Sequence, residues 1–448
     1  MPVRVASCSV FPPLVAYMFI IYNLLFPLLF LFYLPYYLVH IFRRGGLTRD
    51  YWERFGFFSS EKKALLRGLR HPIWIHAVSV GETVAAISFV KSWLQRHPDD
   101  TIVFSCGTST GFETAAKKMP PQVVRIYCPI DFYCAVRHTL NLIRPEMLLI
   151  FEVEIWPNLV LQAAKRGVKV ALINGRMSDR SSRGYARWQW IFRPIFQGFS
   201  NICLQTEEDA DRVRRVIGDD PRIQSCGTMK FDQIPDCDSA DKHQELDNCF
   251  GSGKRILFTA GSTHAGEEEL ICDAYRQLKT EHPELKLVLV PRHQERAAAV
   301  ENVLLERGLS WRLLRPRPEQ PPTEDPVDVL LVNTTGELMN FYAASDITYV
   351  GKSLAGQTGG HNIIEPAIFG KAILYGSHME NFRAVAEIFQ KHQAALEIAS
   401  DDLLLPALRE LIEQPEKRQE LGRKARQVVD QYRGSIARTL DILDQLRT

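Results

Sequence analysis

Short apolar segments alternate with longer helix-like segments along most of this chain, and that alternation limits the folds open to it. Apolar runs of five or six residues in the first half predict β-strands at residues 73–78, 101–105, 123–127, 147–151, 168–173 and 201–205. Strands separated by helices pair in parallel, because a parallel connection needs a crossover of about a dozen residues. The sequence therefore predicts an α/β fold with a parallel sheet.

A second set of predicted strands follows a polar break, at residues 255–260, 286–290, 327–332, 346–350 and 372–375. At 448 residues the chain is long enough for two or three domains. We expect a Rossmann-like domain over residues 45–235, a linker over 236–253, a second Rossmann-like domain over 254–425, and a C-terminal helix over 426–448 that packs back towards the N-terminal domain. Doubly wound sheets bind ligands at the carboxyl ends of their strands, so we expect the two domains to face each other across a cleft.

The first 44 residues differ from the rest in composition. The 28 residues from Leu14 to Ile41 include no Lys, Arg, Asp or Glu, and as a helix they would extend about 42 Å against a hydrocarbon core of about 30 Å. Two arginines follow, and by the positive-inside rule they place the remaining chain on the cytoplasmic side. Residues 1–44 are therefore predicted to be a single uncleaved membrane anchor. Pro27 and Pro35 leave a membrane-embedded hairpin or an interfacial segment open as alternatives.

Charge and cysteine content narrow the class of protein. Charged residues make up 24% of the chain and the net charge is only +2, which does not favour nucleic-acid binding. The nine cysteines include no CxxC pair. Reduced thiols in a cytosolic compartment fit this pattern better than a disulfide or zinc framework.

The stretch Gly351–Gly370 carries the strongest binding signal in the second half. It follows a predicted strand and leads into a predicted helix after Asn362. Its glycines, Gly359 among them, would let backbone N–H groups approach a phosphate near a helix N-terminus. Glu365 in the first helical turn could accept hydrogen bonds from ribose hydroxyls. The alternative is that Glu365 only complements the helix dipole and the glycines only turn the chain.

Three more loops with small, basic or acidic residues follow predicted strands in the same half. They carry Ser262 with Thr263, Arg292 with His293, and Gly336 with Glu337. A doubly wound sheet brings such loops to one edge, where a nucleotide and its phosphate are expected to bind.

The first half places acids at two strand ends. Ser79 and Glu82 lie where the first predicted strand gives way to a helix, and a carboxylate there is usually only a helix-terminal acid. Glu152 and Glu154 lie two residues apart beyond another strand, so both would point to one side. Arg176 follows the next strand. Paired acids at a strand end more often mark a site than a core.

Residues 176–193 contain five arginines interleaved with four aromatic residues. Such a segment suits an anionic lipid interface. It equally suits an ordinary amphipathic helix whose aromatic face packs into the core.

In their number and order, these motifs closely resemble those of the 3-deoxy-D-manno-octulosonic acid (Kdo) transferases of lipopolysaccharide synthesis. The similar segments are His76–Glu82, Phe151–Pro157, Asn174–Ser178, Gly227–Asp232, Ala260–Glu268, Pro291–Arg296, Gly336–Leu338 and Gly359–Pro366. The resemblance extends from the N-terminal segment to about Phe382. Thr228 and Met229 stand where the family has an Asn-Leu pair.

The resemblance implies a GT-B fold, CMP-Kdo as donor, a lipid A precursor as acceptor, and a place at the inner membrane with the catalytic domains on its cytoplasmic face. It implies an inverting transfer with Glu82 as general base, although Glu152 and Glu154 could supply the base instead. Acceptor-binding or supporting residues would be Ser79, Glu152, Glu154 and Arg176. Donor-binding residues would be Lys230, Ser262, Thr263, Arg292, His293, Gly336, Glu337, Gly359, Asn362 and Glu365. No Asp-x-Asp motif ends a predicted strand, so we expect no metal and no cofactor.

Two other classes stay open at this point. An undecaprenyl-linked GlcNAc transferase or a nucleotide-sugar epimerase would share the Glu365 motif. A noncatalytic, membrane-tethered nucleotide-sugar sensor would need no base at Glu82.

Overall fold

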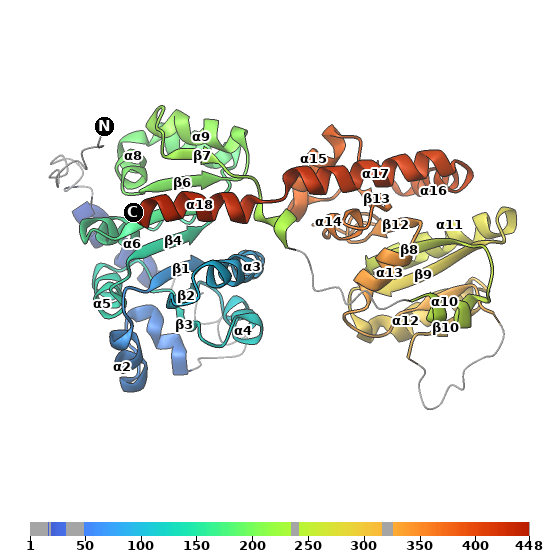
Figure 1. Ribbon diagram of the computed structural model, residues 1–448, viewed down its shortest axis with the longest axis horizontal. Helices are drawn as coiled ribbons and strands as arrows, with labels where there is room; N and C mark the ends of the chain where they lie inside the picture. The colour runs from blue at the N-terminus through green and yellow to red at the C-terminus, as the bar shows by residue number, and fades with distance from the viewer. Residues whose placement is uncertain (1–16, 18, 33–48, 234–241, 316–325, 448) are drawn as a thin grey trace. The chain divides into compact units, whose positions relative to one another are not determined.

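The computed structural model describes residues 17, 19–32, 49–233, 242–315 and 326–447. They form two compact units (Figure 1). Unit 1 lies within Met1–Gln233 and Gly434–Thr448, and unit 2 lies within Ile234–Arg433.

Unit 1 is built on a seven-stranded parallel sheet with the order β3-β2-β1-β4-β5-β6-β7. Its strands are β1 (Ile73–Ala77), β2 (Ile102–Cys106), β3 (Val124–Tyr127), β4 (Met147–Phe151), β5 (Lys169–Gly175), β6 (Asn201–Leu204) and β7 (Ile223–Ser225). All six strands predicted in this half are confirmed. The short edge strand β7 was not predicted.

Helices cover both faces of this sheet. They are η1 (Arg49–Phe55), α2 (Ser60–Gly68), α3 (Val80–Arg96), α4 (Ser109–Lys118), α5 (Tyr133–Ile143), α6 (Pro157–Lys165), α7 (Asp179–Arg187), α8 (Gln189–Gln197), α9 (Glu207–Ile217), η2 (Met229–Asp232) and α18 (Ser435–Arg447). Along β1, Trp74 belongs to one buried cluster and Ile73 and Ile75 to the other. Successive side chains of a strand point to opposite faces, so the sheet has a core on each side.

The last helix of the chain belongs to unit 1. In Figure 1, α18 (red) lies among the blue and green elements of this unit, and it packs against α3, β5 and η2. Asp232 fixes its start, because the two carboxylate oxygens accept the Gly434 N–H at 2.6 Å and the Ile436 N–H at 2.7 Å. Ile436, Leu440 and neighbouring apolar residues of α18 complete the core on that face.

Unit 2 has a second seven-stranded parallel sheet, with the order β10-β11-β9-β8-β12-β13-β14. Its strands are β8 (Ile256–Thr263), β9 (Leu285–Pro291), β10 (Trp311–Leu313), β11 (Val329–Leu331), β12 (Ile347–Val350), β13 (Ala372–Gly376) and β14 (Leu396–Ile398). The five predicted strands are confirmed as β8, β9, β11, β12 and β13. The three-residue edge strands β10 and β14 were not predicted.

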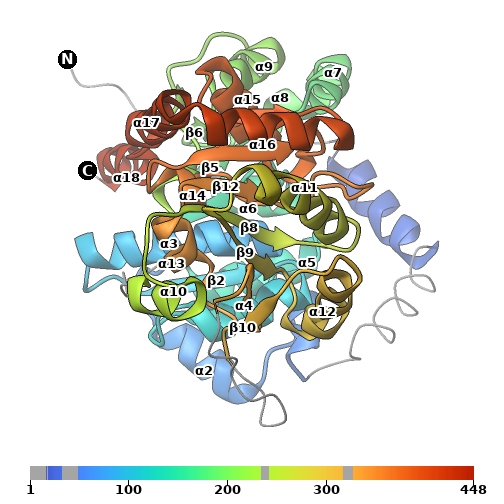
Figure 2. The ribbon, with the colours of Figure 1, turned by 90° about the vertical axis from the view of Figure 1, so that its right-hand side faces the viewer.

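Helices also cover both faces of the second sheet. They are α10 (His243–Phe250), α11 (Glu267–Glu281), η3 (Gln294–Arg296), α12 (Ala297–Glu306), α13 (Leu338–Ala344), α14 (Ile364–Ala367), η4 (Glu380–Phe382), α15 (Arg383–Lys391), η5 (Asp401–Leu403), α16 (Leu404–Glu413) and α17 (Pro415–Tyr432). On one face, α11 packs against α12 and α16 (Figure 2). Leu287 and Leu289 of β9 belong to the core on that face, and Val288 and Val290 belong to the core on the other.

The units do not begin and end where the sequence suggested. The expected linker, residues 236–253, contains α10, whose Leu246, Cys249 and Phe250 are buried in the core of unit 2. The sequence did not predict this helix, because most of its residues are polar and only its inner face is apolar. The expected start of the C-terminal segment at residue 426 falls inside α17, which belongs to unit 2.

The N-terminal segment packs on unit 1 through one face of a helix. Residues 19–32 are helical, Pro27 included, and most of the expected anchor, with Pro35, lies outside the described residues. The Tyr22 hydroxyl donates to Asp131 Oδ2 at 2.8 Å. The opposite face is apolar and more than half exposed, through Ile20, Ile21, Leu24, Leu25, Leu28, Leu29, Leu31 and Phe32. Within the part of the chain that the structure describes, no helix has the length and apolarity needed to span a membrane.

Candidate active site

Each sheet brings predicted site residues to its topological switch point. The strand order reverses between β1 and β4 in unit 1, and between β8 and β12 in unit 2. Glu82 follows β1 and Glu152 follows β4, whereas Ser262 ends β8 and Asn362 follows β12. Ligands of open parallel sheets bind outside the carboxyl ends of the strands at such points. The topology therefore favours one ligand site on each unit.

Glu82 lies in the first turn of α3 and is 7% exposed. A capping box begins the helix, because Ser79 Oγ accepts the Glu82 N–H and Glu82 Oε1 accepts the Ser79 N–H, both at 3.3 Å. Glu82 Oε2 accepts the Val78 N–H at 2.7 Å. A carboxylate offers about four lone-pair sites. The helix-capping role therefore leaves room for a further partner.

Glu152 and Glu154 lie beyond the end of β4 and form an acidic cluster with Glu82. Burial and then the charge of Glu82 raise the pKa of Glu152 to about 7, while Lys230 and Arg176 act in the opposite direction. Burial, Glu82 and Glu152 raise the pKa of Glu154 to about 7. Acids with pKa values near neutrality cluster at functional sites. The structure thus brings together the acids and the arginine that the sequence assigned to the first domain.

Lys230 also lies in unit 1, on η2, where burial lowers its pKa and Glu152 raises it. Thr228 Oγ1 accepts the Lys230 N–H at 3.4 Å. Met229 is fully buried, and its N–H donates to Asn174 Oδ1 at 3.0 Å. The Thr-Met pair therefore builds a well-supported turn that presents Lys230 to the acidic cluster.

In unit 2, the carboxylate of Glu267 joins the loops that follow β8 and β12. This fully buried side chain accepts five hydrogen bonds. The donors are the Tyr349 hydroxyl at 2.7 Å and the N–H groups of His264 at 3.0 Å, Lys352 at 2.8 Å, Ser353 at 2.9 Å and Leu354 at 3.2 Å. Charge-assisted hydrogen bonds of this kind are stronger than neutral ones. Glu267 therefore fixes the shape of both loops.

Gly351 is required by the packing of these two loops. A Cβ at this position would lie 2.5 Å from Ser262 O and 2.9 Å from Glu267 Oε2. The Gly351 N–H donates to Gly261 O at 2.9 Å. This glycine therefore serves close approach of the two strand ends.

The helix after Asn362 is shorter than the sequence suggested. Helix α14 spans only the four residues Ile364–Ala367, and the chain turns at Gly370, whose φ is 65°. The helix-dipole argument for a phosphate at this point was wrong, because one turn of helix carries little macrodipole.

Glu365 remains a candidate ribose ligand. Burial raises its pKa to about 7, while a hydrogen bond from Asn362 and the charge of Arg292 lower it. Arg292 itself is exposed at the end of β9, and its N–H donates to Thr263 O at 3.0 Å. The structure therefore brings Arg292, Asn362 and Glu365 together in unit 2.

Two other predicted donor-binding groups are held inside unit 2. The Gly359 N–H donates to Glu380 Oε2 at 2.6 Å. The amide that we expected to bind a phosphate is therefore hydrogen-bonded to a carboxylate. Glu337 forms an ion pair with Lys242 at 2.9 Å. Neighbouring Gly336 has a φ of 90°, which a glycine adopts without strain. These contacts come from loops distant in sequence, which no local motif reveals.

Residues Ser262 and Thr263 lie at an irregularity of β8. The register against β9 shifts between Gly261 and Thr263, and Ser262 has a φ of 55°. A bulge of this kind re-aims the residues that follow it. Thr263 is fully buried, whereas His293 is exposed.

Sequence reasoning missed three residues of this site: His264, Lys352 and His361. His264 and His361 form a close pair, with 3.1 Å between their Nε2 atoms. Lys352 has a φ of 67° and contributes positive charge to both histidines. All three lie inside the loops that follow predicted strands, and this position in the sequence could have identified them as candidates.

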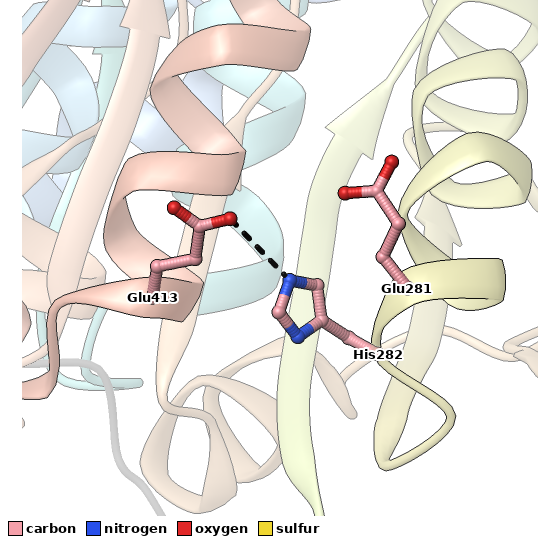
Figure 3. A group of neighbouring side chains, drawn as sticks. All are labelled: Glu281, His282 and Glu413. Carbon is pink, nitrogen blue, oxygen red and sulfur yellow. Dashed lines mark ion pairs between the residues drawn. The ribbon is translucent and has the colours of Figure 1, made fainter.

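One cluster in unit 2 has the residue types of a metal site. Glu281, His282 and Glu413 have ligand atoms within 4.8 Å of one another. Figure 3 shows Glu413 turned towards His282, with 3.8 Å between Oε1 and Nε2. Arg409 already holds Glu281 through two contacts, at 3.0 and 3.2 Å. These residues end α11 and α16, away from the carboxyl ends of the strands, and the arginine favours an ion-pair network over a cation site.

The family model and the curated relatives agree on one family. Residues 49–233 match the family model described as 3-deoxy-D-manno-octulosonic-acid transferase. The 3-deoxy-D-manno-octulosonic acid transferase of Haemophilus influenzae is 31% identical over 87% of this chain and 90% of its own length. That of Bordetella pertussis is 29% identical over 90% of this chain and 94% of its own length. MurG of Acinetobacter baumannii shares the fold, with a TM-score of 0.50, 14% identity and coverage of 84% of this chain and 99% of its own.

The acidic cluster of unit 1 should destabilise the protein above neutral pH. The pKa of Glu154 is raised to about 7 in the folded state, so its stabilising effect is present below about pH 4.5 and is lost as the pH rises through 7. We expect Glu154→Gln to increase the free energy of unfolding in urea by about 1 kcal/mol at pH 8, discounted for partial exposure. The gain should shrink towards pH 5.

Exposed Glu113 on α4 provides the matched control. Glu113→Gln should change the free energy of unfolding little at either pH. A Glu154→Gln gain of equal size at pH 5 and pH 8 would show that charge in the cluster is not its cause.

Proposed function

This chain belongs to the 3-deoxy-D-manno-octulosonic acid (Kdo) transferase family, and from this premise we propose that it transfers Kdo from CMP-Kdo to a lipid A precursor. The main support is family membership together with the placement of polar residues at both switch points. In this proposal, the chain has the two-domain organisation of the GT-B glycosyltransferases. Unit 1 binds the acceptor, and unit 2 binds the nucleotide-sugar.

The charges of the two units support this division of roles. Unit 1 offers Glu82, Glu152 and Glu154, which suit an acceptor hydroxyl that must lose a proton. Unit 2 offers Arg292 and Lys352, which suit the phosphate and carboxylate of CMP-Kdo. Asn362 and Glu365 would hold the ribose, together with the donors near Ser262 and Gly336.

Glu82 is proposed as the general base of an inverting displacement. It would remove the proton of the acceptor hydroxyl as that oxygen attacks the anomeric carbon from the face opposite CMP. Its backbone donors, Val78 and Ser79, fix the direction of the carboxylate. Arg176 would support the acceptor through the neighbouring carboxylates, whereas Lys230 keeps its expected role as a donor ligand.

The reaction is proposed to need no divalent metal. Charge builds up on the CMP phosphate as the bond to Kdo breaks, and fixed donors lower that barrier most when they are in place beforehand. The positive charges of Arg292 and Lys352 can offset that negative charge.

The enzyme is also proposed to act at the cytoplasmic face of the inner membrane. The support is the exposed apolar face of the helix at residues 19–32, here called the leucine face and defined by Leu24, Leu25, Leu28 and Leu29. Exposed Trp188, between α7 and α8, and exposed Trp190, in the first turn of α8, add amphipathic rings of the kind found at membrane interfaces. Tyr185 and Phe192 of the same segment instead pack on the core of unit 1.

Purified protein in detergent should transfer Kdo from CMP-Kdo to a lipid A precursor, and mass spectrometry of the lipid should show the added sugar. Activity should persist in EDTA, because arginine and lysine rather than a metal neutralise the phosphate. UDP-GlcNAc should not serve as donor. Transfer from UDP-GlcNAc, or nucleotide binding with no turnover, would favour another glycosyltransferase or a noncatalytic sensor.

Glu82→Gln should lower turnover by about 10²–10⁴-fold, the usual contribution of a positioned base. Glutamine is compatible with a capping box, so α3 should remain folded. Donor affinity should stay close to that of the unchanged protein, because Glu82 lies in unit 1. Initial rates and donor binding provide the measurement.

Glu152→Gln and Glu154→Gln are the matched variants, and they should retain more activity than Glu82→Gln. Near-normal turnover in Glu82→Gln, together with an inactive Glu152→Gln or Glu154→Gln, would assign the role of general base to Glu152 or Glu154 instead. Melting curves from circular dichroism should verify that each variant is folded.

Replacing the leucine face with glutamine should release the enzyme from membranes. Burial of one leucine is worth about 1.5–3 kcal/mol, so loss of four should lower the membrane-bound fraction at least tenfold. The face that packs on unit 1 is left intact. Sedimentation of lysates from expressing cells measures the distribution.

Leu65→Gln on α2 is the control, since Leu65 is exposed to a similar extent, 51%. It should leave the membrane-bound fraction unchanged. Retention of the leucine-face variant on membranes would assign the attachment to another part of the chain.

A further inference from the structure

The imidazole rings of His264 and His361 meet edge to edge at the switch point of unit 2, with their Nε2 atoms towards each other. Their centroids are 5.4 Å apart with 15° between the planes, and their Nε2 atoms are 3.1 Å apart. His264 follows β8 and His361 follows β12. Both rings therefore lie where an open parallel sheet binds its ligand.

Two nitrogens at this distance must share one proton. One Nε2 carries a hydrogen and donates it, and the other accepts it with its lone pair. A second proton would place a hydrogen on each Nε2, and the two rings could no longer bond to each other. Both N–H groups would then be free to donate to an outside acceptor, such as an anionic oxygen.

The surroundings of the pair oppose that second proton. Burial and then the charges of Arg292, His264, Lys352 and His293 lower the pKa of His361 to about 3. Burial, Lys352, His293 and Arg296 lower the pKa of His264, against the charge of Glu267. The carboxylate of Glu267 is already used by five donors. The histidine pair is therefore neutral and lies among several cations, an arrangement that favours the binding of an anion.

Negative charge is what the proposed donor brings. CMP-Kdo carries one charge on its phosphodiester and one on its carboxylate. An anion among Arg292, Lys352 and His293 removes the repulsion that keeps the histidine pair neutral. It also supplies the acceptor oxygens that a doubly protonated pair needs.

We propose that His264 and His361 form an anion subsite that takes up one proton from solvent when the nucleotide-sugar binds. In the balanced step, the pair with one shared proton gains a second, its internal hydrogen bond breaks, and two Nε2–H bonds to the anion form. The charge of the site rises by one as the anion enters. This inference rests on the proposed function, because the donor supplies the anion.

The added proton has a consequence for transfer. When Kdo leaves, its bond to the CMP phosphate breaks and the electron pair stays on the phosphate oxygen. A protonated histidine pair already in contact with that phosphate would stabilise the new charge without waiting for solvent. The pair would then be preorganised for the departing group.

The test uses isothermal titration calorimetry of the full protein at pH 7.5 with the methyl phosphodiester of cytidine 5′-monophosphate. This probe has one permanent charge and no phosphate proton that titrates near neutrality. Comparison of binding enthalpies in two buffers with different ionisation enthalpies gives the number of protons taken up. We expect close to one proton per ligand, and an affinity that falls up to about tenfold per pH unit as the pH rises.

His264→Gln and His361→Gln should bind the probe more weakly, by about tenfold, and take up almost no proton. Glu365→Gln is the first control, because Glu365 is the other group near Arg292 whose pKa is shifted towards neutrality. It should alter affinity yet keep the proton uptake. His282→Gln, which removes a histidine from the opposite edge of the sheet, should change neither quantity.

Binding of the probe without proton uptake would overturn this inference and leave the proposed function standing. Uptake that persists in the double variant His264→Gln/His361→Gln would also overturn it, because another group would be the proton acceptor. Failure of the unchanged protein to bind the probe would overturn both the inference and the assignment of unit 2 to a cytidine nucleotide.

Discussion

The number of hydrogen bonds that a buried carboxylate accepts distinguishes a structural acid, Glu267, from a candidate catalytic acid, Glu82. Glu267 and Glu82 occupy equivalent places, each in the first turn of the helix that follows a strand at its sheet's switch point. Glu267 accepts five donors, which leaves none of the about four lone-pair sites of a carboxylate free. Glu82 accepts only two, both from its own loop. The saturated acid can only shape loops, whereas the unsaturated acid keeps the capacity to accept a proton.

The two sites also carry opposite charge. At the switch point of unit 1, burial and then the charge of Glu82 raise the pKa of both Glu152 and Glu154. At the switch point of unit 2, burial and then the charges of Arg292 and Lys352 lower the pKa of His361. A glycosyl transfer needs this contrast, because one reactant loses a proton while the other gathers negative charge on its leaving group. Like charges held close together are costly, so each unit is less stable than it could be at the point where its chemistry is expected.

Sequence patterns predicted the long elements well and the tertiary contacts poorly. Central strands such as β1 and β8 were predictable, because burial on both faces requires continuous apolar runs. Three-residue edge strands contain too few residues to show a pattern. Helix α10 was missed because only Leu246, Cys249 and Phe250 of its residues face the core. Individual site residues such as Glu82 and Glu365 could be located from motifs at strand ends. The Gly359 amide could not be judged, because its partner Glu380 comes from a different loop.

Two charged residues near the switch points, Glu152 and Lys352, also have strained backbone conformations. Glu152 directly follows β4, and Lys352 lies two residues after β12. Their φ values are 54° and 67°, which glycine adopts without cost and other residues do not. Such conformations cost on the order of 1–3 kcal/mol each and persist only when neighbours hold them. The Glu152 N–H donates to Ile173 O at 3.0 Å, and the Lys352 N–H donates to Glu267. Glycine at either position would relieve the strain but would remove a carboxylate or an ammonium group. These positions therefore keep a charged side chain at a cost in stability. Local sequence preference does not predict a positive φ at either residue, although the strand-end position of Glu152 was enough to identify it as a candidate site residue.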